Sequence, residues 1–405
     1  MNESWEYAEA DTQSHVHGLH LYPARMIPQI ASRLIKENSS EGQTVLDPFC
    51  GSGSVLAEAL ILSRNAIGID INPLAIMLSR AKTSSIPPNS LALVFDQVLN
   101  NVERNITLNK ENKYKPEVFY FKNIYHWFNR NVVNDLSIIK ESMEKVEVNN
   151  ESIRNLLRVC FSATLLQASN VAFADNPYFA RAKTGEALKK HAPNVLEIFK
   201  KNVLEYQERM RVFYELIPKR VSCKVLEHDS RHMPLQDNSV NIIVTSPPYG
   251  EESHTMSYSR FTKLSLLWLG YSVSDINKNI SKSLGGILTA FRDISPSLDR
   301  LHRQLTRKER QRAREVFSFF WDYKKCIDEM YRVLHHGGSA CIVIGDRSAS
   351  GMKVSNGQIT QELTESSGFS HIKTYHRRIP KKVLPRNDSK IDLINEENIL
   401  ILRKE

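Results

Sequence analysis

The chain contains few cysteines and no long apolar stretch, and both absences limit what it can be. Its five cysteines are scattered over 405 residues and form no CxxC pair. We therefore expect neither a disulfide framework nor a zinc cluster, and we predict no metal site. No apolar stretch approaches the roughly 20 residues of a membrane span, and the first residues are polar, without an apolar signal segment. We expect a cytoplasmic protein that does not bind membranes.

Two common nucleotide-binding motifs are also missing. The segment DPFCGSG at residues 47–53 has two glycines, but Leu56 occupies the position where a GxGxxG motif requires its third. No GxxxxGKS/T motif occurs either. The sequence therefore argues against a complete dinucleotide fingerprint and against a nucleoside triphosphate site.

Positive charge is in excess and is concentrated in two segments. The net charge is +9, and residues 300–315 contain seven Arg and Lys against two Glu, a local +5. A second basic cluster lies at residues 376–386. A basic helix is often only a solvated face, but two such clusters favour contacts with the phosphates of a nucleic acid. The candidate contacts are Arg303, Arg307, Lys308, Arg310, Arg314, Arg377 and Arg378.

Strand and helix patterns divide the chain into three parts. Residues 1–85 and 221–405 alternate apolar strands with amphipathic helices, which is typical of a parallel α/β sheet. Residues 86–220 have mainly helical periodicity, and we interpret them as a helical insertion. A basic helix is expected near 300–315, and another helix over 317–334 should end at a glycine pair, Gly337-Gly338. The seven predicted strands cover residues 45–47, 66–70, 223–226, 240–245, 339–345, 371–379 and 398–402.

The turn at 47–53 joins the first predicted strand to a helix. Its glycines would let the backbone approach a ligand closely, and the helix N-terminus would supply amide donors. A purely structural turn is an equally reasonable interpretation. Asp70 ends the second strand, where a carboxylate can accept both hydroxyls of a ribose unless it only caps a helix. Asp229 follows the third strand and could reach an adenine amine or simply cap its loop.

The segment after the fourth strand has the chemistry of an amine-binding pocket. The apolar run 240–244 is followed by TSPPYG at 245–250. Prolines fix the chain direction and donate no backbone hydrogen bond. Carbonyl groups at this strand end therefore stay free as acceptors beside the ring of Tyr249. This arrangement suits a flat ring that carries an NH2 group, such as a nucleobase.

Together these motifs resemble those of the S-adenosylmethionine-dependent DNA amino-methyltransferases of bacterial restriction–modification systems. The shared features are DPFCGSG, Asp70, TSPPYG and the segment HLYPARMIP at 20–28, which is similar to the motif that closes over the cofactor's methionine part in permuted members. The resemblance covers residues 15–85 and 221–405 but not the helical insertion. It implies a Rossmann-like α/β fold with a seven-stranded sheet whose last strand is antiparallel.

The resemblance also assigns residues to a site. Tyr22 and Pro23 would close over the cofactor, Asp70 would hold its ribose, and Asp229 with Ser230 would lie near its adenine. The residues near the methionine and sulfonium would be Asp47, Phe49, Gly51 and Gly53. The catalytic pocket would consist of Ser246, Pro247, Pro248 and Tyr249. Only 17 positions separate Asp229 from Ser246, so target recognition is expected in 86–220, in 251–315 or in both.

We predict methyl transfer from S-adenosylmethionine to the N4 amine of cytosine in double-stranded DNA, with base flipping. In the enzymes that the chain resembles, Ser before Pro-Pro-Tyr is more common for cytosine N4 than for adenine N6. Ring-carbon methylation would need a cysteine after a proline, and no cysteine here follows one. Three alternatives stay open: adenine N6 methylation, methylation of a base amine in RNA or tRNA, and non-catalytic DNA binding on a decayed scaffold. A separate restriction endonuclease is a further expected partner.

Overall fold

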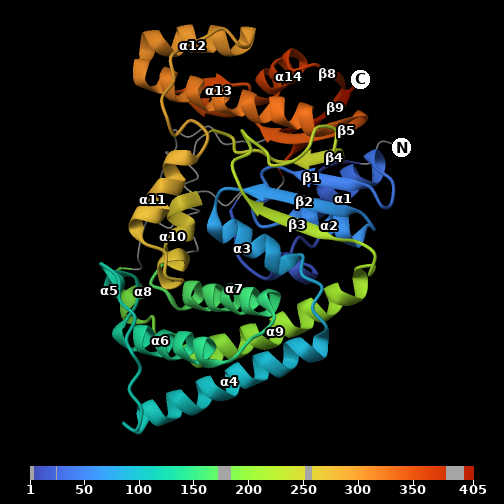
Figure 1. The fold of residues 1–405 in the computed structure, drawn as a ribbon. Helices are drawn as coiled ribbons and strands as arrows, with labels where there is room; N and C mark the ends of the chain where they lie inside the picture. Colours follow the sequence, from blue (N-terminus) through green and yellow to red (C-terminus); the bar gives the residue numbers. More distant parts are fainter. Residues whose placement is uncertain (1–3, 24, 172–183, 251–257, 380–395) are drawn as a thin grey trace.

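The fold is built on one mixed β-sheet with helices on both faces (Figure 1). The computed structural model describes residues 4–23, 25–171, 184–250, 258–379 and 396–405. Within these residues, seven strands form the sheet in the order β3-β2-β1-β4-β5-β9-β8. The strands are β1 (Thr44–Asp47), β2 (Asn65–Asp70), β3 (Cys223–Glu227), β4 (Val240–Thr245), β5 (Leu334–Gly345), β8 (Phe369–Arg378) and β9 (Glu396–Lys404).

The predicted Rossmann-like sheet is confirmed in strand number and direction. The first five strands of the order pair in parallel, whereas β9 is antiparallel to both β5 and β8. The last strand of the chain is thus the antiparallel one, as expected. The sequence analysis did not predict a small separate hairpin, β6 (Arg347–Ala349) with β7 (Met352–Val354).

Alternation along the buried strands explains why helices cover both faces. In β1, Val45 belongs to one hydrophobic cluster and Leu46 to a second, and in β4 Val244 and Ile243 divide in the same way. Successive side chains of a strand point to opposite faces, so a strand that is apolar at every position needs cover on both. The first cluster includes side chains of α1 (Pro28–Asn38), α2 (Ser54–Ile61) and α3 (Pro73–Lys82). The second includes side chains of α12 (Pro296–Lys308), α13 (Arg310–Val333) and α14 (Asn356–Ser366).

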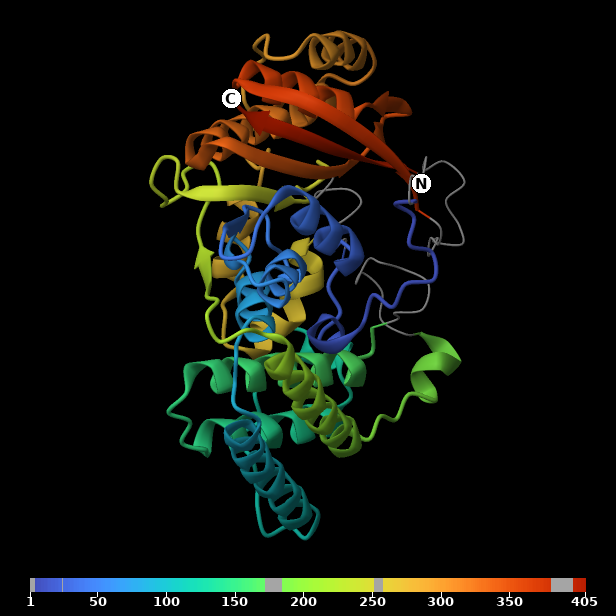
Figure 2. The same ribbon diagram turned by 90° about the vertical axis from the view of Figure 1, so that its right-hand side faces the viewer.

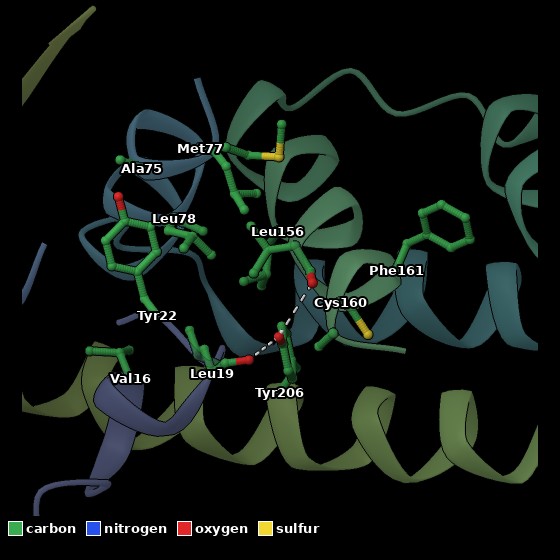
Figure 3. Close-up of a cluster of buried hydrophobic side chains, with 14 of the residues drawn as sticks. Val16, Leu19, Tyr22, Ala75, Met77, Leu78, Leu156, Cys160, Phe161 and Tyr206 are labelled. Carbon is green, nitrogen blue, oxygen red and sulfur yellow. Dashed lines mark hydrogen bonds between the residues drawn. The ribbon is translucent and has the colours of Figure 1, made fainter. Parts of the chain in front are cut away.

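The insertion between β2 and β3 is helical, as predicted, and lies at the opposite end of the molecule from α12 (Figures 1 and 2). Its side chains share the first hydrophobic cluster with α1–α3. Figure 3 shows this junction, where Leu156 of the insertion lies near Met77 and Leu78 of α3. The Tyr206 hydroxyl donates to the Leu19 carbonyl across the same junction. The helices are α4 (Pro88–Lys110), α5 (Ile124–Trp127), α6 (Arg130–Lys145), α7 (Glu151–Ala168), α8 (Gly185–Lys189) and α9 (Val195–Leu216).

Two expectations about helices are wrong. The glycine pair does not cap a helix: α13 ends at Val333, and Gly337 (φ +75°) lies inside β5, where the pairing with β4 shifts register. A positive φ at a register shift is typical of a β-bulge. The basic segment 300–315 is not one helix, because α12 ends at Lys308 and α13 begins at Arg310, with Glu309 extended between them.

Three further helices complete the described part of the chain. A short 3-10 helix, η1 (His15–Gly18), lies near the N-terminus. The helices α10 (Tyr258–Trp268) and α11 (Val273–Lys282) stand between the insertion and the α12–α13 layer (Figure 1). None of the helices in the described ranges combines the length and apolar character of a transmembrane segment.

Candidate active site

A cavity of about 770 Å³ opens at the carboxyl ends of β1, β2 and β4. The strand order reverses between β1 and β4, and ligands of open α/β sheets bind at such a point. Most residues predicted for the cofactor and the catalytic pocket line this cavity. They are Tyr22, Pro23, Asp47, Phe49, Gly51, Asp70, Asp229, Ser230, Ser246 and Pro248. Gly53, Pro247 and Tyr249 are neighbours of these residues along the chain but are not among the lining residues.

The glycine-rich loop between β1 and α2 requires glycine at two positions. Gly51 and Gly53 have φ of +48° and +80°, a left-handed conformation that other residues rarely adopt. A Cβ on Gly53 would lie 2.9 Å from the Ser79 Cα, and one on Gly51 would lie 3.3 Å from the Tyr22 ring. The absence of a side chain at Gly53 lets α3 pack closely against the loop. Its absence at Gly51 leaves space beside the Tyr22 ring at the cavity wall. The loop therefore leaves the backbone accessible to a ligand beside the N-terminus of α2.

Two carboxylates at the strand ends are held by backbone and hydroxyl donors. Asp70 accepts from the amides of Gly51 (2.9 Å) and Asn72 (2.8 Å), which ties the loop to the end of β2. Burial raises the pKa of Asp70 to about 6, although these amide hydrogen bonds oppose the rise. Asp47 accepts from the Thr245 hydroxyl at 2.6 Å, and burial raises its pKa to about 7. Both acids thus change charge near neutral pH.

Asp229 and Ser230 lie beside the loop, but an arginine already engages Asp229. The Arg231 side chain donates to both Asp229 carboxylate oxygens at 2.7–3.0 Å and pairs with Asp322 at 2.7 Å. The Ser230 hydroxyl donates to the Pro48 carbonyl. Sequence reasoning missed Arg231, although it directly follows the two predicted residues. An adenine amine would share Asp229 with this guanidinium.

The TSPPYG segment after β4 is held by residues from distant parts of the chain. The Asn356 amide donates to the carbonyls of Tyr249 (3.2 Å) and Gly345 (2.8 Å). The Tyr249 hydroxyl donates to Glu397 of β9 at 3.0 Å. The other Glu397 oxygen pairs with Arg377 of β8 at 3.1 Å. A chain of interactions from Tyr249 through Glu397 to Arg377 thus extends from the TSPPYG segment into the antiparallel part of the sheet.

This chain corrects one predicted DNA contact. Arg377 is only 7% exposed and is ion-paired with Glu397, so its guanidinium is not presented to a phosphate. Its neighbour Arg378 is exposed. The sequence could not reveal the pairing, because Arg377 belongs to a run of basic residues and Glu397 lies on the next strand. The remainder of that basic cluster, residues 380–386, lies outside the described residues.

The other basic candidates surround the corner between α12 and α13. All five are exposed and none lines the cavity: Arg303, Arg307, Lys308, Arg310 and Arg314. The Lys308 ammonium donates to the Ser350 carbonyl, which holds the hairpin β6–β7 to this corner. Arg312, which the sequence analysis did not select, is buried, lines the cavity and pairs with Glu315 at 3.1 Å.

Away from the cavity, His15, His17 and Glu58 form a group of possible metal ligands that the sequence analysis did not anticipate. Their ligand atoms lie within 4.8 Å of one another, and His17 Nε2 is 2.9 Å from Glu58. Burial, with the nearby cations Lys82 and Arg25, holds the pKa of His17 well below its usual value. The Arg25 guanidinium, which donates to the His17 carbonyl, opposes the binding of a metal cation beside it.

Known proteins support an assignment to a family. Residues 1–80 match the DNA methylase family model N6_N4_Mtase. The chain is 29% identical to the Type II methyltransferase M.MvaI of Kocuria varians, over 98% of this chain and 91% of that protein. It is 31% identical to the Type II methyltransferase M.MjaII of Methanocaldococcus jannaschii, over 24% of this chain and 18% of that protein.

A solved structure, the rRNA methyltransferase aviRa from Streptomyces viridochromogenes, covers 99% of this chain and 97% of its own at 10% identity, with a TM-score of 0.34. The fold assignment rests instead on the strand order, which places a glycine-rich loop, an acid at the end of β2 and the segment TSPPYG around one cavity. From this site and the matches in sequence, the chain is identified as a methyltransferase that uses S-adenosylmethionine and is similar to the DNA methylases of the N6/N4 family.

Proposed function

We propose that the chain methylates the exocyclic N4 amine of cytosine in double-stranded DNA and that the target base leaves the duplex to react. The observation that carries the proposal is the position of Ser246-Pro247-Pro248-Tyr249. This tetrapeptide follows β4 directly and adjoins the same cavity as the glycine-rich loop and Asp70.

The cofactor half of the site has the donors and acceptors that S-adenosylmethionine requires. Asp70 would accept the ribose hydroxyls, and Asp229 with Ser230 would lie near the adenine. Tyr22, Pro23 and the loop residues Asp47, Phe49, Gly51 and Gly53 would surround the methionine part. The bound cofactor supplies a methyl group carried on a positively charged sulfur. An ionised Asp47 at the cavity wall favours that charge electrostatically.

The target half has to make a poor nucleophile reactive. The lone pair of a cytosine amine is delocalised into the ring, which leaves the nitrogen planar. The Ser246 hydroxyl and the Pro247 carbonyl would each accept a hydrogen bond from one N–H group of the amine. These hydrogen bonds would favour a pyramidal nitrogen with a localised lone pair. Tyr249 would stack on the base, and alignment then contributes more than acid–base catalysis. The methylated nitrogen is briefly cationic and loses its proton to Ser246 or to water.

A base inside a duplex cannot reach this cavity, so extrusion of the target is part of the proposal. Extrusion costs a few kcal/mol, which stacking on Tyr249 and phosphate contacts would offset. The basic side chains at the α12–α13 corner are exposed and would contact the phosphates. Recognition of the target sequence is assigned to the helical insertion, to residues 251–315 or to both. A separate restriction endonuclease that cuts the same sequence would be the biological partner.

One experiment tests the base and the substrate class together. The protein would be incubated with labelled S-adenosylmethionine and either plasmid DNA or RNA, followed by digestion to nucleosides and mass spectrometry. We expect N4-methylcytosine in DNA. N6-methyladenine would overturn the choice of base and leave DNA amine methylation intact, whereas label in RNA alone would overturn the substrate. Saturable cofactor binding without any product would indicate a scaffold that has lost catalysis.

A further inference from the structure

The last turn of α11 and the segment between α11 and α12 expose an unusual group of apolar side chains. Ile287 is 69% exposed, Ile280 42%, Leu288 38% and Phe291 37%. Single exposed apolar residues are ordinary, but a group of them rimmed by polar residues is typical of a contact surface. This group lies within twelve consecutive residues, 280–291.

Hydrogen bonds to α13 hold the segment on both sides of its most exposed residue. The Gly285 amide donates to Asp322 at 3.1 Å, and the Thr289 amide donates to the Ser318 hydroxyl at 2.8 Å. Asp322 is itself paired with Arg231 at 2.7 Å. Ile287 and Leu288 are therefore displayed on an anchored loop, and little conformational entropy is lost when such a loop binds a partner.

The anchored loop adjoins the catalytic segment. A Cβ on Gly250, the residue after Tyr249, would lie 2.9 Å from the ring of Phe319, and one on Gly285 would lie 3.0 Å from the backbone of Phe319. Both segments thus pack against the same residue of α13. Leu288 lines the cavity that Ser246 also lines. The more exposed Ile287 directly precedes Leu288 in the chain.

Cationic side chains lie on the C-terminal side of the apolar loop, together with one acid, Asp293. Arg292 follows it, exposed, with its guanidinium 4.9 Å from the centre of the Trp321 ring. His302 of α12 stacks on Phe291 at 4.0 Å, which connects the loop to the helix that carries Arg303 and Arg307. An apolar tip next to cationic side chains is complementary to duplex DNA, in which phosphates flank an apolar stack of bases.

We propose that Ile287, supported by Leu288, enters the DNA stack at the position that the target base leaves and holds the duplex open there. The proposal rests on the proposed function, because it assumes an extruded base. Apolar side chains that insert between base steps unstack and kink a duplex. Extrusion is easiest for bases that are already unpaired. An apolar wedge should therefore matter most when the target is normally paired.

The test compares the double variant Ile287→Ala/Leu288→Ala with the wild type on two duplexes that contain the sequence methylated by the wild type. One duplex pairs the target normally, and the other has an abasic site opposite the target. We expect kcat/KM to fall at least about tenfold on the paired duplex but to stay within about twofold of the wild type on the abasic one. Ile372→Ala, a control at an exposed position on β8 (55%), should change neither rate.

The outcomes separate this inference from the proposed function. Unchanged kcat/KM of the double variant on the paired duplex would overturn the wedge alone, because methylation would still occur. Equal losses on both duplexes would also overturn it, since a structural defect does not depend on pairing. Nucleoside analysis of the same duplexes checks the proposed function separately: N6-methyladenine in place of N4-methylcytosine would overturn the proposed base, while the two rates would still test the wedge. Affinity for S-adenosylmethionine should be the same in all variants, which checks that the cavity is intact.

Discussion

The two halves of the cavity are assembled in opposite ways. Most of the proposed cofactor half comes from one short stretch, Asp47 to Asp70, in which a strand, a glycine-rich loop, a helix and a second strand follow one another. Tyr22, Pro23, Asp229 and Ser230 complete it. The target half combines the segment after β4 with side chains that lie about a hundred residues or more away along the chain, among them Asn356 and Glu397. The first half should therefore tolerate changes elsewhere in the molecule, whereas the second should depend on distant supports.

A substitution at Tyr249 should distinguish the two halves of the cavity most strongly. Tyr249→Ala removes the ring that is proposed to stack on the base, and stacking on an aromatic side chain is worth roughly 1–3 kcal/mol per base. We expect kcat to fall by up to about 100-fold, while calorimetric titration shows unchanged S-adenosylmethionine affinity. Tyr249→Phe keeps the ring and should lose far less. Equal losses in the two variants would transfer the role from the ring to the hydroxyl.

On the cofactor side, Asp70→Asn should weaken S-adenosylmethionine binding by about 30-fold, because hydrogen bonds to a charged acceptor are lost. The wild type should bind more tightly as pH rises, since the pKa of Asp70 is raised to about 6 and the ionised form accepts the ribose hydroxyls. Affinity should increase from about pH 5 to about pH 7 and then level off. Titrations across this range provide the measurement. If the S-adenosylmethionine affinity of Asp70→Asn still rose with pH over this range, the group that titrates would be Asp47.

Glu397→Gln tests whether a distant support sets the target half. The change weakens the charge-assisted hydrogen bond that the Tyr249 hydroxyl donates to Glu397. We therefore expect kcat to fall about tenfold, while the affinity for S-adenosylmethionine stays unchanged. The neighbouring exposed residue supplies the control, Glu396→Gln. The double variant Tyr249→Phe/Glu397→Gln should be no worse than the more impaired single variant. Additive losses would show that the two side chains act independently.

The smallest effect is expected at the α12–α13 corner. Replacing Arg307, Arg310 and Arg314 by Gln should weaken DNA binding several-fold near physiological salt and reduce the slope of log K against log salt by up to about three. Replacing three exposed lysines remote from the cavity, Lys36, Lys219 and Lys224, is the matched control. A slope that is unchanged in the arginine variant would make this corner an ordinary solvated surface.

The contacts around the glycine-rich loop could be predicted from the sequence, whereas the side chains that hold Tyr249 could not, and the reason is chain distance. Gly51, Gly53 and Asp70 meet because consecutive elements of a βαβ unit bring them together, so local patterns suffice. Arg377 looked like a phosphate ligand because it stands in a basic run, and only the pairing of β8 with β9 reveals its partner Glu397. Gly337 looked like a helix cap because a glycine pair follows a helix, whereas the register of β4 against β5 decides its role.

The junction in Figure 3 determines how far this architecture can be treated as modular. Side chains of the insertion and of α3 belong to one hydrophobic cluster, and Tyr206 bonds to the backbone of the N-terminal segment. Excising residues 86–220 would leave an apolar face of α3 uncovered. Exchanging the insertion for that of a relative would require a matched set of contacts at Met77, Leu78 and Leu19. New target specificities in this scaffold should therefore arise by substitution on exposed surfaces rather than by exchange of whole segments.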